Sequence, residues 1–126
     1  MSLKIKIIAN RTPGKKEELK YHAVSIVSGR TDLDTLAELV SDQTSMTKAD
    51  CYGVLIALEH NIINELEDGR IVQLGNIGSF QISVSSHPTD TKKEFRSSNI
   101  KSAKILYRPG KDFKKMLKSL SFRLTK

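Results

Sequence analysis

The chain has 126 residues, of which 38% are hydrophobic and 28% are charged, and its formal net charge is +7. This length and composition fit a globular domain with modest appendages, and no apolar run approaches the roughly 20 residues of a membrane-spanning helix. Because the N-terminus lacks the apolar segment of a secretory signal and Cys51 is the only cysteine, we expect a cytoplasmic protein with no internal disulfide.

The charges are unevenly distributed along the chain. Residues 1–30 carry seven Lys or Arg and two Asp or Glu, residues 31–69 carry one and nine, and residues 70–126 carry thirteen and three. Two basic segments therefore flank an acidic one, which favours a face built to bind a polyanion. A basic surface that only confers solubility is the alternative interpretation.

Two strands are expected first, over residues 3–9 and 20–27, where apolar and polar residues alternate. Pro13 and Gly14 between them indicate a turn. We therefore expect residues 1–30 to form an N-terminal β-hairpin.

Two helices are predicted next, because apolar residues recur there at helical spacing. Thr47 followed by Asp50 resembles a capping box at the start of the second helix, and Asp68 with Gly69 ends it. So much apolar surface on two helices requires a further partner, which favours dimerisation, although packing on a sheet is the alternative. The apolar positions are Leu33, Leu36, Leu39 and Val40, then Cys51, Val54, Leu55, Leu58, Ile62 and Leu66.

Three strands and a final helix are predicted for the second half of the chain. Pro109 and Gly110 end the third strand, and the helix opens at Lys111. The last residues, SFRLTK, form either a tail or a short strand. The strands are expected over residues 70–74, 79–84 and 100–107, with a polar segment at 85–99.

The stretch LGNIGSF places two glycines, Gly75 and Gly78, between two predicted strands. No Gly-Lys-Ser/Thr sequence and no helix follow, so the stretch is neither a Walker loop nor a dinucleotide fingerprint. The residues themselves indicate a tight turn in which Gly75, Asn76 and Gly78 are free to adopt positive φ.

The sequence contains no catalytic or metal-binding constellation. His22, His60 and His87 are scattered, and no metal-ligand spacing links them to Cys51. The carboxylates near the helix ends are interpreted as solvated surface. We therefore expect a protein that is not an enzyme and that has no cofactor, metal or small-molecule substrate.

The stretch YRPGKDFKKM has the features of a phosphate-binding motif. Gly110 and Lys111 stand where a strand gives way to a helix N-terminus, whose free backbone N–H groups favour an anion. Arg108 adds positive charge beside them, and Lys114, Lys115 and Lys118 continue it along the helix. A solvated helix face is the alternative interpretation.

Taken in order, these elements resemble the HU/IHF family of bacterial nucleoid DNA-binding proteins over roughly residues 31–120. The family pattern Leu-x-Gly-Phe-Gly-x-Phe aligns without a gap with LGNIGSF, and Phe-Lys-x-Gly-Lys aligns with YRPGK. Asn76 replaces the first glycine of the family's triplet and Ile77 its phenylalanine, and the arm is short and lacks the family's Arg-x-Asn-Pro tip. The additional residues 1–30 resemble the longer HU-related branch with an N-terminal β extension.

The resemblance implies an α+β protein with an IHF-like DNA-binding fold. This fold has two N-terminal helices, a three-stranded antiparallel sheet with a short β-arm, and a C-terminal helix. Residues 31–126 would form the HU-like domain, and residues 1–30 the extra hairpin. The family is dimeric, so a homodimer with a concave saddle is expected. Its expected core residues are Leu55, Leu58, Ile62, Ile77 and Phe80.

The resemblance also implies sequence-tolerant binding of duplex DNA in the nucleoid, with an architectural role in bending or compaction, since HU and IHF are themselves minor-groove architectural proteins. Lys and Arg contacts to phosphates would supply the affinity, with little base reading. Pro88 is the candidate for a wedge between base steps. The expected DNA-binding residues are Arg70, Asn76, Gly78, Lys92, Lys93, Arg96, Lys101, Lys104, Arg108, Gly110, Lys111, Lys114 and Lys115.

Two other functions stay open at this point. An assembly module would keep the HU-like dimer and use the N-terminal hairpin to add a strand to a partner protein. Binding of single-stranded nucleic acid would need exposed aromatic rings, whereas most of the aromatic residues fall at core-like positions. Lys15 and Lys16 lie outside the resemblance and are expected to contribute little to DNA binding.

Overall fold

The structure is a computed structural model that describes residues 2–11, 14 and 18–125. It is an α+β protein with three helices and two small sheets. The chain forms two compact units: a central unit, residues 33–115, and a terminal unit, residues 1–32 with 116–126. Pro13, Lys15 and Lys16 lie outside the described residues, whereas Gly14 has the positive φ of a turn, 88°.

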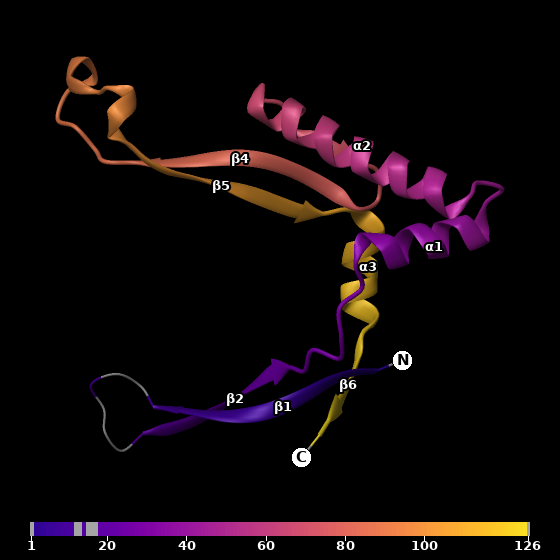
Figure 1. The fold of residues 1–126 in the computed structure, drawn as a ribbon. Helices are drawn as coiled ribbons and strands as arrows, with labels where there is room; N and C mark the ends of the chain where they lie inside the picture. The colour runs from indigo at the N-terminus through magenta and orange to yellow at the C-terminus, as the bar shows by residue number, and fades with distance from the viewer. Residues whose placement is uncertain (1, 12–13, 15–17, 126) are drawn as a thin grey trace. The chain divides into compact units, whose positions relative to one another are not determined.

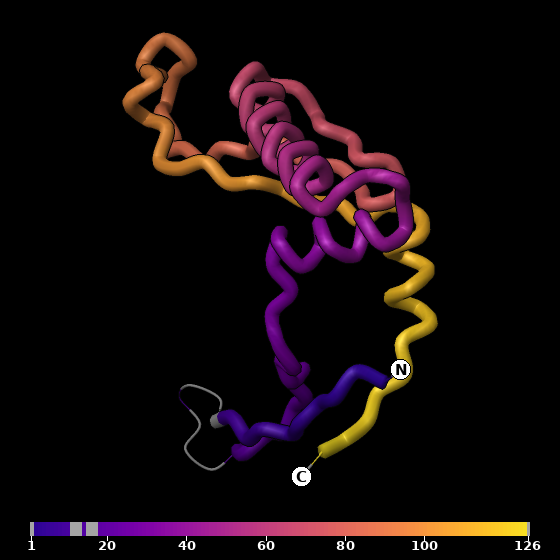
Figure 2. Tube along the Cα trace, turned by 45° about the vertical axis from the view of Figure 1, so that its right-hand side comes forward, coloured from indigo at the N-terminus to yellow at the C-terminus, as the bar shows by residue number. Residues whose placement is uncertain are grey.

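The terminal unit contains a three-stranded sheet in the order β2-β1-β6. β1 (Ser2–Arg11) pairs antiparallel with β2 (Leu19–Ser25), which confirms the predicted pair of strands. β1 also pairs in parallel with β6 (Ser121–Leu124), so the chain ends in a short strand. The two ends of the chain therefore lie side by side in one sheet (Figures 1 and 2).

In the central unit, α1 (Leu33–Gln43) and α2 (Lys48–Glu67) form a helical hairpin (Figure 1). Thr47 Oγ1 accepts a hydrogen bond from the Asp50 N–H at 3.1 Å, which confirms the predicted cap. Gly69 adopts a φ of 81° just after the helix, in agreement with the predicted end. No helix in the described part of the chain is both long and apolar enough to cross a membrane.

The second half of the central unit contains the predicted antiparallel sheet, in the order β3-β4-β5. A segment with two short 3-10 helices joins β4 to β5, and the His87 N–H closes its base by donating to the Asn99 carbonyl at 2.8 Å. α3 opens at Lys111, as predicted. The bounds are β3 (Val72–Leu74), β4 (Gly78–Ser86), the 3-10 helices (Lys92–Glu94 and Ser97–Asn99), β5 (Ile100–Pro109) and α3 (Lys111–Ser119).

The central sheet has one apolar and one polar face, because side chains alternate along a strand. Ile82 lies opposite Ile105 on the apolar face, and both line a shallow hollow with Ile63 and Leu66 of α2. α2 runs along this face (Figure 1) but leaves much of it exposed, since Val84 and Ile105 are 59% and 60% exposed. The other face carries mostly polar side chains, namely Gln73, Ser79, Gln81, Ser83, Ser85, Ser102, Lys104 and Arg108.

The core of a single chain is small. Among the described residues, only Ala37, Cys51 and Leu66 are buried apolar residues. Of the residues expected in a dimer core, Leu58 and Ile77 are 39% and 43% exposed, and the other three, Leu55, Ile62 and Phe80, are half-buried. One chain therefore leaves much of the apolar surface of its helices exposed to water, although burial of that surface is favourable.

Candidate nucleic-acid interface

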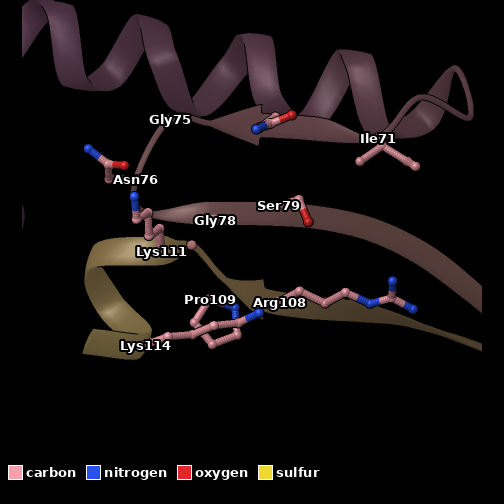
Figure 3. Close-up of a pocket in the computed structure, with 11 residues that line it drawn as sticks. Ile71, Gly75, Asn76, Gly78, Ser79, Arg108, Pro109, Lys111 and Lys114 are labelled. Atoms are coloured by element: carbon pink, nitrogen blue, oxygen red, sulfur yellow. The ribbon is translucent and has the colours of Figure 1, made fainter. Parts of the chain in front are cut away.

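A hollow of about 420 Å³ lies where the turn between β3 and β4 meets the junction of β5 and α3 (Figure 3). Both predicted motifs line it, although roughly 30 residues separate them in the sequence. No acidic residue is among those that line the hollow. Six residues expected to bind DNA line it (Asn76, Gly78, Arg108, Gly110, Lys111 and Lys114), together with Ile71, Gln73, Gly75, Ser79 and Pro109.

The turn is closed by a hydrogen bond from the Ile77 N–H to the Leu74 carbonyl, at 2.9 Å. Gly75, at the second position, has a φ of 50°. Asn76, at the third, has no positive φ, because every described residue with positive φ is a glycine. The expectation of a positive φ at Asn76 is therefore wrong. A positive φ at the second position alone is the type II′ pattern, which does not require an unusual backbone conformation of Asn76.

Glycine is required at Gly78 and Gly110 because the backbones of the turn and the junction touch there. A Cβ atom on Gly110 would collide with the carbonyl group of Asn76, and one on Gly78 would collide with the carbonyl oxygen of Arg108. Gly78 also has a φ of 131°, which disfavours any residue with a side chain. Asn76 thus takes part in the site through its main chain, which the Gly110 backbone approaches.

Two hydrogen bonds to one carbonyl hold the turn against the junction. The Ile77 carbonyl accepts from the Gly110 N–H at 3.1 Å and from the Tyr107 hydroxyl at 2.7 Å. The ring of Tyr107 in turn packs beside Phe80, with 5.0 Å between the ring centroids. The geometry of the hollow is therefore fixed by contacts to the sheet.

We expect Gly110→Ala to destabilise the protein by about 1–3 kcal/mol, because the added methyl group forces the Asn76 backbone away from its position. Urea unfolding followed by circular dichroism measures the change. Gly29→Ala is the matched control: a Cβ placed there meets no atom within 4 Å, so we expect no loss, or a gain of roughly 0.4–1 kcal/mol. Equal destabilisation by both changes would contradict this packing role.

The N-terminus of α3 opens into the hollow. The Gly110 carbonyl accepts a hydrogen bond from the Lys114 N–H at 2.9 Å, so Gly110 is the N-cap of the helix. The first N–H groups of a helix have no intrahelical partner, and the helix dipole is positive at this end. Lys114 reaches toward Pro109, and Arg108 extends along the strands (Figure 3). Backbone donors and cations together form a site that can hold a phosphate.

Beyond the hollow, the polar face of the central sheet continues along β4 and β5. Lys104 lies opposite Ser83, and the hydroxyl groups of Ser85 and Ser102 are 2.8 Å apart. Such small side chains allow a phosphate backbone to approach the sheet closely. The serines and Gln73 were absent from the expected site, but their alternation with apolar residues such as Ile82 is a sequence signal that could have identified them.

The structure does not bring Arg70 to this face. The Arg70 guanidinium pairs with Glu65 at 2.9 Å and with Asp68 at 2.6 Å, and the Arg70 N–H donates to the Glu65 carbonyl. Its position is thus set by the end of α2. Lys101 has no pairing partner in β4, because the register shifts between Ser85 and Ser86, so the alternation of side chains does not assign it to either face.

The remaining residues expected to bind DNA lie outside the hollow. Pro88, Lys92, Lys93 and Arg96 belong to the exposed segment between β4 and β5, at the end of this hairpin far from the hollow (Figure 1). Arg96 Nη1 donates to the Lys93 carbonyl at 3.3 Å, which orders part of the segment. Lys115 is exposed on α3 but does not line the hollow, unlike its neighbour Lys114.

The chain matches one family model along nearly all its length. The model, HU-HIG, is described as an HU domain fused to wHTH, Ig, or Glycine-rich motif, and it matches residues 1–124. Comparison with curated proteins gives no match. The fold is similar to that of a "Putative bacterial DNA binding protein" from Bacteroides vulgatus ATCC 8482, with a TM-score of 0.68 and 9% identity. The match covers 98% of this chain and 48% of the other, so this chain spans about half the length of that protein.

Proposed function

We propose that this chain, which belongs to the HU-HIG family of HU domains, binds duplex DNA as a homodimer through the polar face of its central sheet. DNA is the partner that membership of a family of HU domains suggests. The main observation in favour of this surface is the hollow, in which Arg108, Lys111 and Lys114 surround the N-terminus of α3. The proposal gives the protein a binding role and no catalytic step.

Binding would be sequence-tolerant because the groups at the surface recognise phosphates. Backbone N–H groups, cations and hydroxyls donate hydrogen bonds to an oxygen that every nucleotide carries. Lys104 and the serines would extend the contact along the duplex from the hollow. Pro88, exposed in the segment between β4 and β5, remains the proposed wedge for bending, beside Lys92, Lys93 and Arg96 as arm contacts. An architectural role in the nucleoid follows from this mode of binding.

A second copy of the chain is proposed to cover the exposed apolar surface of the helices. Val54 is 55% exposed on α2, and Leu36 and Leu39 are 43% and 48% exposed on α1. Extensive apolar surface is unusual on a protein that functions as a monomer. In a two-fold dimer the same surface would serve both partners.

The assembly module remains the second candidate function, because β2 is an edge strand whose Leu19 and Tyr21 are 46% and 67% exposed. An exposed edge of this kind can accept a strand from a partner protein. Such binding would depend on main-chain hydrogen bonds and apolar pockets, so it would respond weakly to salt.

We expect the affinity for duplex DNA of random sequence to fall roughly a thousandfold or more between 50 and 200 mM salt, if about 6–10 phosphates are contacted. Fluorescence anisotropy with a labelled duplex measures this, and a second duplex of unrelated sequence is the control for sequence tolerance. A single strand of the same length tests the alternative of single-strand binding. A nearly flat salt response would favour the assembly module.

A further inference from the structure

All of the excess positive charge of the protein is located in the terminal unit. By sequence, this unit carries ten Lys or Arg and three Asp or Glu, whereas the central unit carries eleven of each. The central unit is therefore neutral overall. The seven cations that the terminal unit has in excess of its anions account for the net charge of +7 of the whole chain. A field that attracts polyanions over a distance must originate mainly in the terminal unit.

The pairing of the terminal sheet places four cations, Lys4, Lys6, Lys20 and Arg123, on one face. Lys4 lies directly opposite Arg123, Asn10 opposite Lys20, and Ile8 opposite His22. Because side chains alternate along a strand, Lys4, Lys6, Lys20, His22 and Arg123 share this face, which we call the basic face. Ile8 and Val24 also lie on the basic face. The opposite face carries Leu3, Ile5, Ile7, Leu19, Tyr21, Phe122 and Leu124.

Nothing within the sheet neutralises the basic face. β1, β2 and β6 contain no Asp or Glu. Among the described residues, no ion pair involves Lys4, Lys6, Lys20 or Arg123. Like charges directly opposite each other on neighbouring strands, such as Lys4 and Arg123, destabilise a sheet. The repulsion between these cations destabilises the free protein, and an anion that binds between them would reduce it.

We propose that the basic face of the terminal sheet is a second phosphate-binding surface for duplex DNA, in addition to the polar face of the central sheet. Lys4 and Lys6 are two positions apart on one strand, which separates them by about 6.6–6.8 Å, and Lys20 and Arg123 stand on the flanking strands. The cations thus form a two-dimensional array without a pocket, which suits an extended polyanion. The choice of DNA as that polyanion rests on the DNA-binding function proposed above.

A membrane surface fits the basic face less well. Proteins that lie in a bilayer interface insert apolar side chains beside their cations. Here Tyr21, Phe122 and Leu124, which are 67%, 61% and 58% exposed, point from the opposite side of the sheet. The apolar residues beside the cations are Ile8, which is 36% exposed, and the half-buried Val24, so the more exposed apolar side chains cannot enter one interface together with the cations.

The test compares two variants of the full chain that lose the same formal charge. Lys4→Gln with Lys6→Gln alters the basic face, whereas Arg30→Gln with Lys118→Gln removes two cations of the same unit that lie outside its strands. Anisotropy with a labelled duplex over a salt series gives the slope of log affinity against log salt. We expect the first variant to lower the slope by about 0.9 for each lysine, and the second to leave it unchanged.

Equal slopes for the two variants, or an unchanged slope for Lys4→Gln with Lys6→Gln, would overturn the proposal. The proposal would also be wrong if Lys4→Gln with Lys6→Gln abolished binding to anionic lipid vesicles but left DNA binding intact. Arg108→Gln with Lys111→Gln, measured in the same series, tests the polar face of the central sheet separately. If only this variant lowers the slope, the second surface is wrong; if only the lysine pair does, the second surface stands and the hollow is wrong.

Thermal melting separates a binding effect from a folding effect. Because Lys4→Gln removes a like-charge pair, we expect a melting temperature that is equal to or above that of the wild type, together with weaker DNA binding. If the Lys4 and Lys6 variant does not fold, Lys20→Gln with Arg123→Gln repeats the measurement on the flanking strands. A folded variant of this second pair with a wild-type slope would overturn the proposal.

Discussion

Reversing the charges of Arg108 and Lys111 together is expected to reduce the affinity for duplex DNA by at least about 100-fold. Each residue flanks the N-terminus of α3 in the hollow, where a phosphate would contact backbone donors and both side chains. A hydrogen bond to a charged group contributes roughly 1.5–3 kcal/mol, so the loss of two such bonds costs about 3 kcal/mol or more. This corresponds to about two powers of ten in the dissociation constant. Anisotropy titrations of Arg108→Glu with Lys111→Glu measure the effect.

The control for this variant is Arg30→Glu with Lys118→Glu, which removes the same formal charge away from the hollow. If the hollow holds a phosphate, the first pair also lowers the salt slope by about one for each phosphate that the protein no longer binds, and the control pair does not. Equal reductions in affinity would instead mean that the protein attracts DNA by diffuse net charge, without a defined site at α3.

Leu58→Asp is expected to abolish the dimer or to unfold the protein. Leu58 is 39% exposed in the single chain, on a helix whose apolar surface is proposed to pack against a second copy. A carboxylate there would lose its hydration on association without gaining a partner, and burial of an unpaired charge is strongly unfavourable. Sedimentation velocity at micromolar concentration gives the oligomeric state, and circular dichroism shows whether the helices persist.

His60→Asp is the matched control on the same helix. It introduces the same carboxylate two positions later, which places it roughly 200° around the helix axis, on the opposite side from Leu58. His60 is exposed, so we expect this variant to remain dimeric and folded. A wild-type protein that sediments as a stable monomer, or a Leu58→Asp variant that stays dimeric, would show that the helices do not form the interface.

The features that could be predicted from the sequence depend on neighbouring residues. The cap at Thr47 uses the N–H of Asp50 three residues later, and the end of α2 depends on the positive φ of Gly69. The start of α3 at Lys111 follows in the same way from Pro109 and Gly110 just before it. In each case the signal and the structure lie within one turn of the chain, where sequence patterns are most informative.

The features that could not be predicted depend on distant partners. The last residues form a strand only because β1 offers an edge about 120 positions earlier. Asn76 is a residue type that often adopts positive φ in turns. In this structure its backbone instead packs closely against Gly110, which follows β5. Lys101 and Lys104 belong to one predicted strand, yet only Lys104 pairs with a residue of β4, because the pairing is irregular at Lys101. A basic residue is thus easily found in a sequence, whereas the surface on which it lies is set by strand pairing.

The order of β2, β1 and β6 also has a consequence for synthesis on the ribosome. β1 and β2 emerge first, but roughly 95 residues separate the end of β2 from β6, the second neighbour of β1. At about 5–20 residues per second, the nascent hairpin waits roughly 5–20 s with one edge unpaired and Ile7, Tyr21 and the rest of its apolar face uncovered. During that interval the unpaired edge of β1 allows two nascent hairpins on one polysome to pair with each other. The central unit, residues 33–115, emerges before β6, so it can fold before the terminal sheet is complete.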